Sequence, residues 1–85
     1  MLAALASDIE PAEVMQVLAA DQRLPVPGTA RGVRVLAIFG RTRAGRPLMV
    51  LVRVDRGGFD HLIVGVRELT GEELAMVERW EEERR

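Results

Sequence analysis

Three short apolar runs separated by tight turns constrain the fold of this 85-residue chain more than any other feature. The runs cover residues 33–40, 47–54 and 59–67, and each contains several β-branched side chains. The segments between them, RTRAGR at 41–46 and DRGG at 55–58, carry the glycines that tight turns favour. Because consecutive strands joined by short turns pair antiparallel, the sequence predicts a three-stranded meander.

A helix is expected before this meander, over about residues 10–21. Pro11 suits the first helical position, where its missing N–H costs nothing. Ile9 and Val14 have the spacing of a hydrophobic staple, which fixes the direction in which the chain enters a helix. The stretch that follows, residues 21–32, contains two prolines and two glycines, and it predicts a connecting loop.

A second helix is expected after the meander, over about residues 70–84. Thr70 is a favourable N-cap, and Glu73 completes a capping box three residues later. The predicted fold class is therefore α+β: a helix, a small three-stranded antiparallel meander and a second helix. All three strands carry apolar residues on both faces, and two short helices are expected to cover one face. The other face then needs a partner, such as a second copy, unless the N-terminal residues wrap over it.

The positive charge of the chain is concentrated in its middle and comes from arginine alone. Residues 23–67 hold nine arginines and two acids, a net charge of +7, whereas residues 1–22 and 68–85 each carry −4. A strip of guanidinium groups suits phosphate, because each group offers several planar donors to one anion. The alternative is that the acidic ends fold back and neutralise the middle.

Composition excludes several classes of protein. The chain has no cysteine, so it has neither a disulfide framework nor a thiolate metal site, and a cytoplasmic location fits. No apolar run approaches the roughly 20 residues that cross a bilayer. His61 is the only histidine, and Asp60 beside it points to the opposite strand face, so neither a metal nor a cofactor is expected.

Two features of the middle segment are candidates for anion chemistry. The glycines and arginines of residues 40–46 make a hairpin tip that could grip a phosphate, although a solvated turn explains the same residues. His61 and Arg67 share a strand face, but six residues of extended chain separate them by about 20 Å. They would reach one phosphate only if a bulge at Gly65 reshaped the strand.

The order of these motifs resembles that of a known toxin family. The motifs are the helix start Ile9-Glu-Pro-Ala-Glu-Val14, the hairpin Gly40-Arg-Thr-Arg-Ala-Gly-Arg46, the strands at 48–52 and 62–67, and Leu69-Thr-Gly-Glu-Glu-Leu-Ala75 with Glu78 and Trp80. Together they are similar to a divergent BrnT-type toxin of the RelE/ParE superfamily. That family shows a G-x-T-x-x-G-R hairpin, a strand ending in Ala-Arg, and a closing helix with acidic and aromatic residues.

The resemblance implies a single RelE/BrnT-like domain over residues 1–85, acting as the toxin of a type II toxin–antitoxin pair. Such a toxin is a metal-independent ribonuclease that cuts mRNA through the RNA 2′-hydroxyl, and its protein partner is an antitoxin. In the catalytic role, Arg67 and Arg34 would stabilise the charged phosphorane, and His61 would transfer a proton. The side chains that would hold the RNA backbone are Arg41, Arg43, Arg46 and Arg53.

The sequence departs from the family at two points. Ser7-Asp8 stands where a basic residue is expected before the first helix, and Gly65-Val66-Arg67 stands where the family has Ser-Ala-Arg. These departures favour an alternative: a catalytically inactive module of the same fold that binds a protein partner or nucleic acid. A third interpretation is a homodimer, formed through the second sheet face, whose arginines only pair with the acidic helices.

Overall fold

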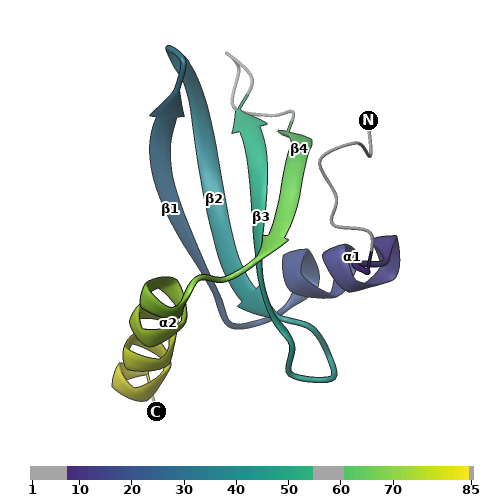
Figure 1. Ribbon diagram of the computed structural model, residues 1–85, viewed down its shortest axis with the longest axis vertical. Coiled ribbons are helices and arrows are strands. Elements are labelled where there is room, and N and C mark those ends of the chain that lie inside the picture. The colour runs from purple at the N-terminus through teal and green to yellow at the C-terminus, as the bar shows by residue number, and fades with distance from the viewer. Residues whose placement is uncertain (1–7, 55–60, 85) are drawn as a thin grey trace.

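The computed structural model describes residues 8–54 and 61–84, His61 by its backbone only. Its elements are α1 (Pro11–Ala19), β1 (Arg23–Ala30), β2 (Val33–Arg41), β3 (Pro47–Val54), β4 (His61–Glu68) and α2 (Gly71–Glu83). The strands form one antiparallel sheet in the order β1-β2-β3-β4 (Figure 1). This confirms the α+β class, whereas the expected three-stranded meander is in fact four-stranded. The turn predicted at residues 55–58 and the first residues of the strand predicted at 59–67 lie outside the described residues.

The additional strand, β1, occupies the segment that was expected to be a loop. Arg31 and Gly32 form a two-residue turn in which both residues have positive φ, 52° and 78°, so β1 folds straight back along β2. Residues flanking such a turn exchange hydrogen bonds, and bonded pairs then alternate along the ladder. By that alternation Pro25 and Pro27 fall where an N–H would face away from β2. The prolines therefore cost the sheet no hydrogen bond on this edge strand.

Both predicted helices form close to their expected boundaries. Pro11 opens α1, and the staple residues Ile9 and Val14 are both buried. At α2 the Glu73 N–H donates to Thr70 Oγ1 at 3.2 Å, and the Thr70 N–H donates to Glu73 Oε1 at 2.9 Å. These reciprocal bonds satisfy two backbone donors that would otherwise have no partner at a helix start.

The two helices lie on opposite faces of the sheet, so the expectation that both would cover the same face is wrong. Val14 and Val17 of α1 pack with one strand face, which is formed by Ile38, Leu48, Val50, Val52 and Val66. Val77 of α2 packs with the other face, on Phe39 and Met49. Because the strands are apolar on both sides, each helix finds its own apolar face to bury against.

Neither helix extends over the whole sheet. In Figure 1 both lie at the end of the sheet where the β2–β3 turn is, while the β1–β2 turn projects at the far end. Four large apolar side chains of the strands are exposed: Val26, Val33, Leu62 and Val64. The half of the sheet that is remote from the helices therefore keeps apolar surface in contact with solvent.

Candidate functional site

Arg67, the residue expected at the centre of catalysis, is held by a carboxylate of α2. Its two terminal nitrogens donate to Glu73 Oε1 at 2.6 Å and to Glu73 Oε2 at 2.7 Å. This hydrogen-bonded pair raises the pKa of Arg67 and lowers the pKa of Glu73 to about 2. The positive charge of Arg67 is thus already matched by a negative charge, with both guanidinium donors aimed at it.

Arg41 is held in a similar way, further along the same helix. Its Nε donates to Glu81 Oε2 at 2.8 Å, and a terminal nitrogen donates to Glu81 Oε1 at 3.0 Å. A third bond, of 3.1 Å, reaches the carbonyl of Gly45 within the β2–β3 turn. Hydrogen bonding to Glu81 raises the pKa of Arg41. This ion pair ties the β2–β3 turn to the C-terminal half of α2.

Arg46 lies among three carboxylates from three parts of the chain. Its nitrogens donate to Asp8 at 2.8 Å, to Glu13 at 3.2 Å and to Glu68 at 3.1 Å. The Arg46 backbone N–H also donates to the hydroxyl of the buried Thr42 at 3.1 Å. Arg46, just before β3, therefore links the segment before α1, α1 itself and the end of β4. With three carboxylates around one guanidinium group, the cluster carries net negative charge.

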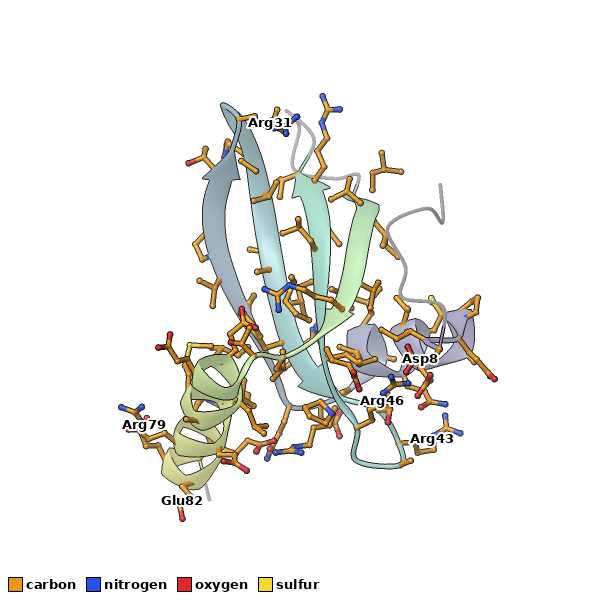
Figure 2. The ribbon with its side chains drawn as sticks, in the orientation of Figure 1. Asp8, Arg31, Arg43, Arg46, Arg79 and Glu82 are labelled. Atoms are coloured by element: carbon orange, nitrogen blue, oxygen red, sulfur yellow. The ribbon has the colours of Figure 1, made fainter. Side chains whose placement is uncertain are left out.

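The remaining arginines of the predicted site form no ion pair with the described residues, and they are dispersed. Arg43 lies at the tip of the β2–β3 turn (Figure 2). Arg53 of β3 is paired with Val35, so it shares that residue's face of the sheet. Arg34 precedes Val35 in β2 and therefore points to the opposite face. No single surface presents Arg34, Arg43 and Arg53 together.

The structure does not bring the three expected catalytic residues together. Arg67 pairs with Met49 and so shares the face that α2 covers, whereas Arg34 lies on the other face. Arg34 also pairs with Thr29 next to the β1–β2 turn, at the opposite end of the sheet from Arg67. The backbone of His61 pairs with Val54 at the start of β4, six residues from Arg67, which corresponds to about 20 Å. A bulge does occur between Leu51 and Val52, but it leaves His61 and Arg67 at opposite ends of the strand.

The alternative interpretation, in which acidic segments neutralise the basic middle, holds for Arg41, Arg46 and Arg67. Among the described residues, every carboxylate that pairs with them lies before β1 or after Arg67 in the sequence. Within residues 8–54 and 61–84, no group of three metal-ligating side chains is found. The same residues contain no helix that is both long and apolar enough to cross a membrane.

An exposed apolar surface whose residues and position sequence reasoning did not identify lies on the α2 side of the sheet. It is called the open face below, and it comprises Val26, Val33, Val35, Ala37, Leu51, Arg53 and Leu62. Leu62 is 59% exposed, Val26 39% and Val33 37%. The surface was missed because β1, which carries Val26, was expected to be a loop. The available signal was the Arg31-Gly32 dipeptide between two apolar stretches, since glycine there permits a tight hairpin.

Comparison with protein-family models, with curated proteins and with solved structures found no match to this chain. The BrnT-type resemblance therefore stays a prediction that depends on the short motifs quoted above.

Proposed function

We propose that this chain is a catalytically inactive module of the toxin type that binds a protein partner through the open face. The observation that supports this proposal most directly is that three of the arginines already form ion pairs within the molecule. Arg67 forms a two-pronged ion pair with Glu73, Arg41 forms another with Glu81, and Arg46 is surrounded by carboxylates. Positive charge that is already neutralised within the molecule is poorly placed to stabilise a phosphorane.

The requirements of ribonuclease chemistry support the same conclusion. A metal-independent cut needs donors fixed in advance around the place where negative charge develops. Arg34 and Arg67 lie on opposite faces and at opposite ends of the sheet, so they cannot flank one phosphate. Binding of Arg67 to phosphate would also require breaking its bonds to Glu73.

The choice of a protein partner over nucleic acid follows from the kinds of side chain that are exposed. Proteins that bind single-stranded RNA usually offer aromatic rings on which bases stack. Among the described residues Phe39 is buried, and Trp80 is half-buried with the guanidinium of Arg84 over its ring at 5.0 Å. The exposed side chains of the open face are mainly aliphatic, as at the core of a protein interface.

The toxin-like motifs make an antitoxin the expected partner, and a cytoplasmic location belongs to the same proposal. The ribonuclease function is tested by incubating the purified chain with a fluorescent single-stranded RNA, and by expressing wild type beside Arg67→Ala. We expect no cleavage, no steeply salt-dependent RNA affinity and equal growth of the two strains. Growth arrest by wild type that Arg67→Ala relieves would contradict the proposal.

A second variant makes this test sharper. Glu73→Gln keeps a side chain that can complete the capping box, but it removes the negative charge that engages Arg67. If Arg67 were a latent catalytic residue, Glu73→Gln would increase RNA cleavage. We expect the variant to be as inactive as wild type, because Arg34 remains on the other side of the sheet.

A further inference from the structure

We propose that the open face binds an amphipathic helix of another protein, one whose apolar stripe is flanked by carboxylates. This inference rests on the proposed function and names the kind of partner. Its first support is the pattern of side chains across the strands. Val26, Ala37 and Leu51 form one row, and Val35, Arg53 and Leu62 form the next. The surface is thus apolar, with one cation set inside it.

The dimensions of the sheet leave room for one helix. A strand of eight residues is about 26 Å long, and a helix with its side chains is about 10 Å wide. On this face α2 packs over Phe39 and Met49, close to the β2–β3 turn. The length of the strands that α2 leaves free therefore accepts one further helix beside α2, which would complete the layer.

The charged residues in this half of the sheet indicate that the partner should carry negative charge. Arg53 forms no ion pair with a described residue, and Arg31 lies at the adjacent β1–β2 turn (Figure 2). The strand segments 24–40, 47–54 and 61–67 contain no acidic residue, so the described strands supply no counter-charge in this half of the sheet. A partner helix that buried Arg53 without a carboxylate would leave an unpaired charge in an apolar contact, which is strongly unfavourable.

The same argument disfavours a second copy of this chain as the occupant. A two-fold dimer places the same patch on both sides of the interface. Stacking one open face on another would bring two Arg53 side chains into one apolar layer to which the described strands contribute no carboxylate. Pairing along the free edge of β1 is blocked as well, because Pro25 and Pro27 have no N–H to donate to an added strand.

The test uses a phage-displayed library of helical peptides with leucine at one stripe of positions and the flanking positions randomised. Peptides are selected on the full chain, and the affinity of an enriched peptide is then measured by fluorescence anisotropy. We expect enrichment of Asp and Glu at the flanking positions. Arg53→Glu and Leu62→Glu should each weaken binding about tenfold or more, through loss of the charge pair and of the apolar contact respectively.

Two matched controls separate this surface from a general effect of added negative charge. Arg34→Glu introduces the same change next to Val35, but on the opposite sheet face. Met15→Glu replaces a methionine of α1 that is 60% exposed, almost the same fraction as the 59% of Leu62. Both controls should bind the peptide as wild type does, and circular dichroism of all four variants should show the folded spectrum.

The inference would be overturned by no enrichment, by enrichment of basic peptides, or by binding that survives both Arg53→Glu and Leu62→Glu. A concentration-dependent dimer that Leu62→Glu dissolves would overturn it too, because a second copy would then be the occupant. None of these results requires RNA cleavage, so failure of this inference is distinguishable from failure of the proposed function.

Discussion

Arg67 at the end of β4 and Glu73 in the first turn of α2 form an ion pair through two hydrogen bonds of 2.6 and 2.7 Å. The same Glu73 carboxylate accepts the Thr70 N–H at 2.9 Å and so also caps the helix. One side chain therefore fixes the helix start and neutralises the strand-end arginine. Arg67, the residue that the resemblance matches to the family's strand-end arginine, thus connects β4 to α2.

The pairing of Glu73 with Arg67 should make stability fall in acid. The pKa of Glu73 in the folded state is about 2, below its ordinary value of 4.5, so its ionised form is favoured by folding. Its contribution is present above about pH 4.5 and is lost as the pH falls towards 2. We expect about 1 kcal/mol, a small value because the pair is partly exposed to solvent. Urea unfolding at a series of pH values should show this loss in wild type, and a weaker loss in Glu73→Gln.

Removal of the Arg46 side chain should destabilise the fold in a salt-dependent manner. Arg46→Ala leaves Asp8, Glu13 and Glu68 close to one another without the cation that now joins them. We expect a lower Tm than wild type at low ionic strength, and a smaller difference in concentrated salt, because salt screens both the lost attraction and the new repulsion. Arg43→Ala, at the tip of the same turn, is the control and should leave Tm unchanged at either ionic strength. A deficit independent of salt would show that Arg46 acts through packing alone.

Gly40 should be intolerant of a side chain because it lies against α1. A Cβ added at this position would lie 3.1 Å from Val17 Cγ1, and Val17 is fully buried. Gly40→Ala should therefore cost about 1 kcal/mol of unfolding free energy through overpacking. In a Val17→Ala background the added methyl group has space, so the two substitutions should be less harmful together than the sum of their separate effects. A double-mutant cycle from urea unfolding measures this coupling, and strict additivity would refute the close contact.

Substitutions at the two residues of the β1–β2 turn should change the stability of the fold in opposite directions. Gly32 has φ +78°, so Gly32→Ala should cost about 1 kcal/mol of unfolding free energy. Arg31 has φ 52°, a conformation that asparagine tolerates better, so Arg31→Asn should raise Tm. Gly28→Ala is the control: its Cβ would meet open space, and its φ is not in the left-handed region. Equal losses from Gly28→Ala and Gly32→Ala would show that the turn does not have this geometry.

Elements that depend on neighbours in the sequence were predictable. The start of α2 is determined by Thr70 and Glu73, whose bonds to each other span three residues. The start of α1 follows from Pro11 and the staple of Ile9 with Val14 in the same way. The short, β-branched apolar runs at 33–40 and 47–54, bounded by turn residues, were sufficient to place β2 and β3, because these signals lie within the segments themselves. β1 was not predictable in this way, since its prolines are acceptable only when their missing N–H groups face away from β2.

The sequence by itself determined the helix caps, the three apolar strands and the excess of arginine in the middle of the chain. The caps depend on short-range hydrogen bonds and the strands on apolar runs between turn residues, so both are local, and the arginine excess is a matter of composition. Only the tertiary structure decided which arginines are neutralised: Arg41 meets Glu81 across 40 residues, and Arg46 meets Asp8 across 38. It also placed the two helices on opposite faces and left the open face uncovered by either helix. Contacts of this kind depend on where the sheet brings distant segments, and no local pattern encodes that placement.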